Sequence, residues 1–109
     1  MEPIVVLTTL PTGEIAATIA RVLVEKRLAA CVNILAPCQS VYRWQGQIET
    51  ASEVPLLIKT EDGRFAALEA ELRRLHPYEL PEIVSLPIVK GSPAYLTWIA
   101  GETLIDDLG

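Results

Sequence analysis

The chain has 109 residues, half of them hydrophobic, with a formal net charge of −5 and a sequence pI of about 4.8. This length and apolar content predict one domain, residues 1–109, with ample material for a core. The nine basic residues form no cluster larger than a pair such as Arg73-Arg74, which argues against binding to nucleic acid or to an anionic membrane surface.

The first third of the chain predicts a strand, a helix and a second strand. Residues 4–9 are β-branched and short, as in a buried strand. Thr12 is a candidate helix N-cap because its hydroxyl can accept a hydrogen bond from the first turn. The apolar residues that follow at helical spacing are Ile15, Ile19, Val22 and Leu23. Residues 30–35 are expected to form the next strand.

The middle of the chain predicts a long β-hairpin. Pro37 interrupts the strand pattern and residues 40–44 resume it. Gln45-Gly46 is typical of a tight turn, because glycine readily adopts a positive φ. The return arm covers residues 47–50 and continues over 53–60. Each arm runs beyond the usual strand length of about 5–6 residues, so the hairpin is expected to project beyond the domain.

The last part of the chain predicts a helix, a strand and a short helix. Asp62 is a candidate cap for the first helix, whose apolar stripe is Phe65, Leu68, Leu72 and Leu75. A strand is expected over residues 82–89. Ser92-Pro93 then begins a helix that Gly101 should end. The chain closes with an apolar tail formed by Leu104, Ile105 and Leu108.

The resulting order, β-α-β-β-α-β with a C-terminal helix, predicts an α+β fold of the ferredoxin-like kind with an antiparallel sheet. Both main helices would pack on one face of that sheet. The other face would then need a partner, and another copy of the chain could supply it.

The segment 76–82 is the most informative for function. It holds the single histidine of the chain, stiffened by Pro77 and Pro81. Imidazole nitrogen and carboxylate oxygen are ligands of divalent metals, so His76 and Glu82 are candidate metal ligands, with a third ligand required from elsewhere. The alternative is that His76 only caps the preceding helix, whose negative end would favour the charged imidazole.

Several other side chains have two interpretations each. The aromatic residues Tyr42, Trp44, Tyr78 and Trp98 could line a ligand cleft or pack at a subunit interface. The interface interpretation is favoured for Trp44. Lys59 could hold an anion or be a solvated charge. Cys31 is expected to pack as a small hydrophobe, whereas Cys38, beside Pro37, is expected to be more accessible.

The apolar runs, the cysteines and the prolines of the chain bear on its localisation and its stability. No apolar run reaches the ~20 residues of a membrane-spanning helix, and the first residues do not have a signal-peptide pattern. Two cysteines are too few for a disulfide scaffold. A cytoplasmic protein is therefore expected. Eight prolines and a single asparagine are consistent with heat stability.

Five segments, in order along nearly the whole chain, together resemble the CutA family of divalent-cation tolerance proteins. They are LAACVNI at 28–34, YRWQGQIE at 42–49, LIKT at 57–60, HPYE at 76–79 with PEI at 81–83, and YLTWI at 95–99. The resemblance implies a ferredoxin-like fold, a tight homotrimer similar to the PII signalling proteins, heat stability and a link to copper tolerance.

The same resemblance implies a metal site. In the family, metal binding is attributed to a histidine and a glutamate that match His76 and Glu82. Some members add a cysteine at the end of the first strand, where this chain has Thr8. Because a hydroxyl is a poor ligand for a soft metal, this difference argues against tight copper binding.

Three functions are compared. The first is a non-enzymatic trimer that binds divalent copper or zinc weakly, without an organic cofactor, and supports metal tolerance. The second is a PII-like signalling or adaptor trimer, with a small ligand in inter-subunit clefts and a partner protein on its hairpins. The third, ranked last, is an enzyme with His76 as general base beside Glu79 or Glu82, for which no substrate is defined.

Overall fold

The structure is a computed structural model that describes residues 2–104. Its elements are β1 (Pro3–Leu10), α1 (Gly13–Glu25), β2 (Cys31–Ile34), β3 (Cys38–Trp44), β4 (Gln47–Glu61), a 3-10 turn (Asp62–Arg64), α2 (Phe65–Leu75), β5 (Val84–Pro87) and α3 (Pro93–Glu102). With β2 and β3 as two parts of one interrupted strand, this order confirms the predicted ferredoxin-like fold.

The sheet is antiparallel and is organised around β4, its longest strand. The strand order is β2-β4-β1-β5, and β3 pairs with the outer half of β4. β1 runs beside β4 from the Pro3–Glu61 pair to the Leu10–Val54 pair. The pairing with β4 is interrupted around Pro37, between the end of β2 and the start of β3, because proline has no amide hydrogen to donate.

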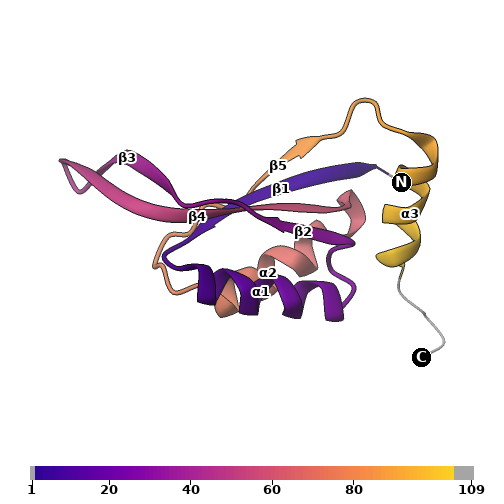
Figure 1. The fold of residues 1–109 in the computed structure, drawn as a ribbon, viewed down its shortest axis with the longest axis horizontal. Helices are drawn as coiled ribbons and strands as arrows, with labels where there is room; N and C mark the ends of the chain where they lie inside the picture. The colour runs from indigo at the N-terminus through magenta and orange to yellow at the C-terminus, as the bar shows by residue number, and fades with distance from the viewer. Residues whose placement is uncertain (1, 105–109) are drawn as a thin grey trace.

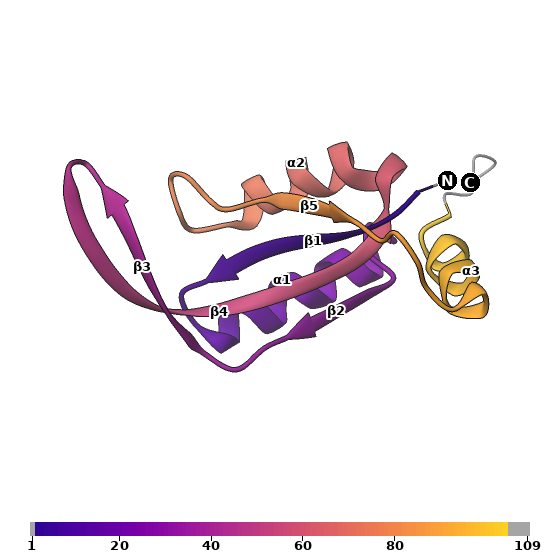
Figure 2. The same cartoon turned by 90° about the horizontal axis from the view of Figure 1, so that it is seen from above.

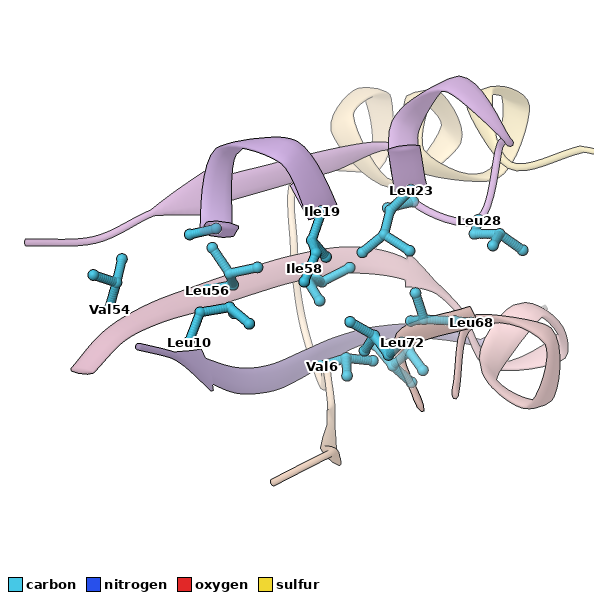
Figure 3. Close-up of a cluster of buried hydrophobic side chains, with 13 residues drawn as sticks. Val6, Leu10, Ile19, Leu23, Leu28, Val54, Leu56, Ile58, Leu68 and Leu72 are labelled. Atoms are coloured by element: carbon cyan, nitrogen blue, oxygen red, sulfur yellow. The ribbon is translucent and has the colours of Figure 1, made fainter. Parts of the chain in front are cut away.

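The core lies between one face of the sheet and the helices α1 and α2, which are on the same side in Figure 1. Alternate residues of β1 and β4 point into it, as the period of a strand requires. Figure 3 shows Val6, Leu10, Leu56 and Ile58 from the strands against Ile19, Leu23, Leu68 and Leu72 from the helices. The predicted helix faces are therefore confirmed except at Val22, which is half-buried and does not belong to the core cluster.

Thr12 caps the start of α1, and an ion pair joins the end of α1 to α2. The Thr12 hydroxyl accepts a hydrogen bond from the Ile15 amide at 3.2 Å, so the predicted N-cap is confirmed. The Lys26 ammonium lies 2.6 Å from the Glu71 carboxylate. Hydrogen bonds from Arg74 and from that lysine lower the pKa of Glu71 to about 2.

The opposite face of the sheet is not covered by α1 or α2. Cross-strand partners share a face, so the pairs Val5–Leu86 and Leu7–Val84 place four apolar side chains together there. Leu86 is 53% exposed. α3 lies at the end of the sheet away from the hairpin tip (Figures 1 and 2). A broad apolar strip thus faces outward in the single chain.

The β3–β4 hairpin projects away from the helices, as predicted (Figure 2). Gln45 and Gly46 at its tip both have positive φ, 49° and 80°, which matches the twist of a tight hairpin. Val41 and Ile48 on its arms are 67% and 61% exposed. The hairpin therefore carries apolar side chains that nothing within residues 2–104 covers.

Three boundary predictions were wrong or only partly right. Asp62 opens a 3-10 turn and does not cap α2, whose N-cap residue is Arg64 without a side-chain bond. The predicted strand 82–89 is reduced to Val84–Pro87, between segments rich in proline. α3 continues through Gly101 to Glu102. In the predicted apolar tail Leu104 is exposed, and Ile105 and Leu108 lie outside the described residues.

Candidate metal site at the root of the hairpin

His76 is the C-cap of α2, so that interpretation of its backbone is confirmed. Its amide donates to the Leu72 carbonyl at 2.7 Å, and its own backbone is extended, with φ −73° and ψ 133°. The extended conformation follows from Pro77, which disfavours a helical conformation in the residue before it. The side chain turns inward and is only 7% exposed. Helix end and proline together direct the imidazole into the protein.

Two backbone groups fix the protonation state of this imidazole. Nε2 lies 2.8 Å from the Thr9 carbonyl oxygen, and the Tyr78 amide lies 3.2 Å from Nδ1. A carbonyl can only accept, so Nε2 carries a proton and donates it. An amide can only donate, so Nδ1 must accept. His76 is therefore neutral, with its proton on Nε2.

Glu53 completes the network from the other side. Its Oε2 accepts hydrogen bonds from the Tyr78 hydroxyl at 2.8 Å and from the Thr9 hydroxyl at 3.1 Å. The rings of His76 and Tyr78 are 4.7 Å apart and tilted by 48°. Glu53 lies on β4 opposite Cys38, where β3 begins. The network thus joins β1, the loop after α2 and the root of the hairpin.

The pKa of each member follows from these contacts. Burial lowers the pKa of His76, and the Thr9 carbonyl and the charge of Glu53 oppose this shift only in part. The expected upward shift from the helix end is therefore wrong, because desolvation dominates. Burial acts to raise the pKa of Glu53, but hydrogen bonds from Ser40, Tyr78 and Thr9 together lower it. Burial, and then Glu53, raise the pKa of Tyr78.

Glu82, the second predicted ligand, is exposed, whereas His76 is buried. Glu82 lies in the segment before β5, and no hydrogen bond within residues 2–104 joins it to His76. The same part of the chain contains no group of three His, Cys, Asp or Glu side chains close enough to hold a metal ion. A site with three such ligands would therefore need at least one from outside residues 2–104.

Thr8, the residue at which the sequence analysis expected a poor metal ligand, is also buried. It is 1% exposed, and its hydroxyl has no hydrogen-bond partner in the described part of the chain. Strand alternation puts Thr8 on the opposite face of β1 from Thr9. Thr9, one residue later, is the residue that contacts His76 and Glu53.

The geometry of His76 fits metal ligation in one respect and not in another. Histidines that bind metals almost always donate their other ring N–H to a carbonyl or carboxylate, which orients the ring. The Nε2 contact with the Thr9 carbonyl is a bond of this kind. Nδ1 would then be the ligand atom, but the Tyr78 amide occupies it. His76 can accept a metal at Nδ1 only when that amide has moved away.

The remaining candidate residues form two groups at opposite ends of the sheet. Tyr42 and Trp44 lie on the hairpin, and Tyr42 is near enough to contribute to the raised pKa of Tyr78. At the other end, Lys59 donates to the Asn33 side-chain oxygen at 2.7 Å. Lys59 also lies 5.9 Å from the ring centre of Tyr95, which stacks with Trp98 at 5.4 Å. The single chain does not bring these residues into one cleft.

Sequence reasoning missed Glu53 and Thr9. Glu53 directly precedes the apolar stretch that starts at Val54. This position is a weak signal that its carboxylate is buried with hydrogen-bond partners, since carboxylates are rarely buried without them. The sequence contains no signal for the role of the Thr9 carbonyl, because every residue has a backbone carbonyl. Neither cysteine is in a disulfide; Cys38 is exposed, as predicted, and Cys31 is half-buried rather than fully buried.

The fold and this network define an α+β protein whose single histidine is clamped between a sheet strand and a proline-rich loop. Within residues 2–104 no helix is long and apolar enough to span a membrane. The family described as "CutA1 divalent ion tolerance protein" matches residues 4–102. The chain therefore belongs to the CutA1 family.

Individual relatives agree with this assignment. The divalent-cation tolerance protein CutA of Thermus thermophilus is 50% identical over 99 residues, which cover 91% of this chain and 96% of that protein. The solved structure of the Thermus thermophilus protein has a TM-score of 0.91 and covers 93% and 98% of the two chains. The structure of CutA1 from Oryza sativa has a TM-score of 0.93 at 37% identity, covering 97% of both chains.

Other members of the family are longer. Protein CutA of Mus musculus is 47% identical over 91 residues, which are 84% of this chain but 51% of the mouse protein. This chain therefore spans about half the length of that relative. The names of these relatives refer to CutA or to divalent-cation tolerance, and none names an enzyme activity.

Proposed function

We propose that this protein is a non-enzymatic homotrimer that supports tolerance to divalent metal ions, copper among them, through weak binding at His76 and Glu82. The observation that carries the proposal is the ring orientation of His76. Its Nε2 donates to the Thr9 carbonyl at 2.8 Å, which leaves Nδ1 as the ligand atom once the Tyr78 amide has moved away from it. Membership in a family named for divalent ion tolerance supports the same function.

Weak affinity follows from the ligands that one chain supplies. Residues 2–104 supply one imidazole and an exposed carboxylate, and Thr8, whose hydroxyl is a poor ligand for a soft metal, lies on the opposite face of β1 from the residue that contacts His76. The lowered pKa of His76 reduces competition from protons near neutral pH. Copper stands at the top of the divalent affinity series, so we expect it to bind more tightly than zinc.

Assembly supports the proposal because residues 2–104 supply no group of three metal-ligating side chains. The uncovered sheet face, with Leu86 and Val84 exposed, and the projecting hairpin are the surfaces on which copies would meet. We place the trimer in the cytoplasm, where reduced thiols such as Cys31 and Cys38 persist. Relatives carry the labels chloroplastic in Arabidopsis thaliana and periplasmic in Archaeoglobus fulgidus, so the compartment varies within the family.

Titration calorimetry with copper(II) at pH 7.5 tests the site. We expect wild type to bind with an affinity weaker than nanomolar and the His76→Ala protein to lose most of the binding heat. Glu82→Gln should weaken binding, whereas Glu79→Gln, a change at an exposed neighbour, should not. Equal binding by wild type and His76→Ala would place the metal elsewhere, with the exposed thiol of Cys38 as the first residue to test.

A further inference from the structure

The β3–β4 hairpin leaves the body of the protein at a junction where each arm lacks a backbone hydrogen-bond donor. Pro37 separates β2 from β3 on one arm, and Pro55 lies in β4 on the other, opposite Thr9 of β1. Neither proline has an amide hydrogen to donate. Along β4, pairing with β3 ends at Glu53 and pairing with β1 begins at Val54. The strand therefore changes partners where two donors are missing.

Beyond this junction the hairpin makes no contribution to the core. It is a two-stranded ribbon, and such a ribbon is at best marginally stable by itself. The buried core cluster of the described residues has no member between positions 38 and 52, and the arms project away from the helices (Figure 2). Val41 and Ile48 on these arms are exposed in the single chain. The direction of the hairpin must therefore be fixed at its root.

Glu53 holds that root. In the described part of the chain, both side-chain hydrogen bonds that join residues 38–53 to other elements end on its Oε2, from the Tyr78 hydroxyl at 2.8 Å and the Thr9 hydroxyl at 3.1 Å. Bonds to an ionised carboxylate are stronger than bonds between neutral groups. Glu53 is only 9% exposed, so water competes little for these bonds. Tyr78 is itself held, because its ring lies 4.7 Å from that of His76.

We propose that Glu53 is a positioning residue for assembly, whose carboxylate braces the root of the hairpin against β1 and against the loop after α2. The inference rests on the proposed homotrimer and names the residue that prepares the hairpin for it. With the brace in place, the apolar side chains of the hairpin face other copies of the chain in one direction. Such preorganisation strengthens association, because the segment does not have to be ordered when copies meet.

Two substitutions remove the donors of the brace without changing Glu53. Tyr78→Phe removes one hydroxyl and keeps the ring, and Thr9→Val removes the other and keeps the backbone carbonyl that bonds to His76. The double variant leaves the Glu53 carboxylate buried without these two bonds, which is unfavourable, so the hairpin should swing until water reaches it. Glu49→Gln is the matched control, because it neutralises an exposed carboxylate on the same hairpin.

Subunit exchange between isotope-labelled and unlabelled full-length protein, followed by native mass spectrometry, measures the effect on assembly. The double variant should exchange subunits about tenfold faster than wild type. This factor corresponds to about 1.4 kcal/mol, near the lower end of what one hydrogen bond to a charged group contributes. Each single variant should act in the same direction, and Glu49→Gln should exchange at the wild-type rate.

Amide hydrogen exchange is the second measurement, because it separates the brace from a general effect on stability. In the double variant, exchange should accelerate over residues 38–53 and stay unchanged in β1 and in the inner half of β4, which carries the buried Leu56 and Ile58. Equal acceleration in the hairpin and in these core strands would contradict the brace, since the bonds would then only add to global stability.

The outcomes separate the brace from the homotrimer. A wild type that sedimentation shows to be a monomer would overturn both. A trimeric wild type whose double variant exchanges subunits at the wild-type rate would overturn the brace alone. If circular dichroism shows that the double variant does not fold, Tyr78→Phe alone decides by the same two measurements, because it keeps the ring that packs against His76.

Discussion

The state of His76 is decided by atoms from three places in the sequence. Its own helix end supplies the position, the Thr9 carbonyl accepts a hydrogen bond from Nε2–H, and the Tyr78 amide donates one to Nδ1. Both nitrogens are satisfied only in the neutral ring. A second proton on Nδ1 would face the Tyr78 amide, donor against donor. Protonation and loop closure are therefore incompatible.

Folding stability should consequently depend on pH through His76. Burial lowers its pKa in the folded protein, while the unfolded chain keeps the ordinary value of about 6.5. The unfolded state thus binds more protons, so stability present above pH ~6.5 is lost as the pH falls towards the lower folded value. With a chelator present, the melting temperature of wild type should fall more between pH 7.5 and pH 5.5 than that of His76→Gln. Parallel curves for the two proteins would contradict this.

At the scale of elements, β4 links the core to the projecting hairpin. Its inner half pairs with β1 and β2 and buries Leu56 and Ile58, and its outer half pairs only with β3. Cross-strand partners show that Trp44 and Tyr42 share one face of the hairpin, while Val41 and Ile48 share the other. Apolar residues on both faces are typical of a segment that other chains enclose.

Trp44→Ala should weaken assembly. Trp44 is 38% exposed in the single chain, and truncating a large aromatic side chain that assembly buries costs roughly 3–5 kcal/mol. We expect a lower melting temperature that depends more strongly on protein concentration than in wild type. Gln47→Ala alters the cross-strand partner of Trp44 and serves as the control, with little effect expected. A Trp44→Ala protein that melts like wild type would show that the residue stays exposed.

At the scale of the whole molecule, residues 2–104 form an elongated body. The radius of gyration is 14.7 Å and the extents are 48 × 30 × 23 Å, whereas a compact domain of this length has a radius of gyration of about 13 Å. The hairpin accounts for the extra length (Figure 1). An extended arm and an uncovered apolar sheet face are both costly in water for a single chain.

These features predict that copies of the chain assemble, and the proposed function makes that assembly a trimer in solution. We expect sedimentation equilibrium at micromolar concentration to give a mass three times the 11.9 kDa of one chain. An obligate interface of this kind should bury more than about 2,000 Å². The mass should not change over a hundredfold dilution. A mass of 11.9 kDa under these conditions would overturn the trimer and with it the proposed source of the third metal ligand.

Local signals were sufficient for most of the fold. The Thr12 cap and the Gln45-Gly46 turn depend on residues within a few positions of each other, and both were predicted correctly. Residues 53–60 were predicted to continue the return arm of the hairpin, and they lie in β4. The predicted Asp62 cap failed because a 3-10 turn precedes α2, and alternative helix starts of this kind differ little in local energy.

The candidate site was different, because its contacts join distant segments. The sequence by itself identified His76 as a functional candidate and as a helix C-cap, since both follow from the segment around Pro77. Only the tertiary structure brought Thr9 to His76, which is 67 residues away in the sequence, and Glu53 to Tyr78, which is 25 residues away. The register of β1 on β4 and the packing of α2 on the sheet decide those contacts. Burial there also reversed the pKa shift that the helix end alone would have produced.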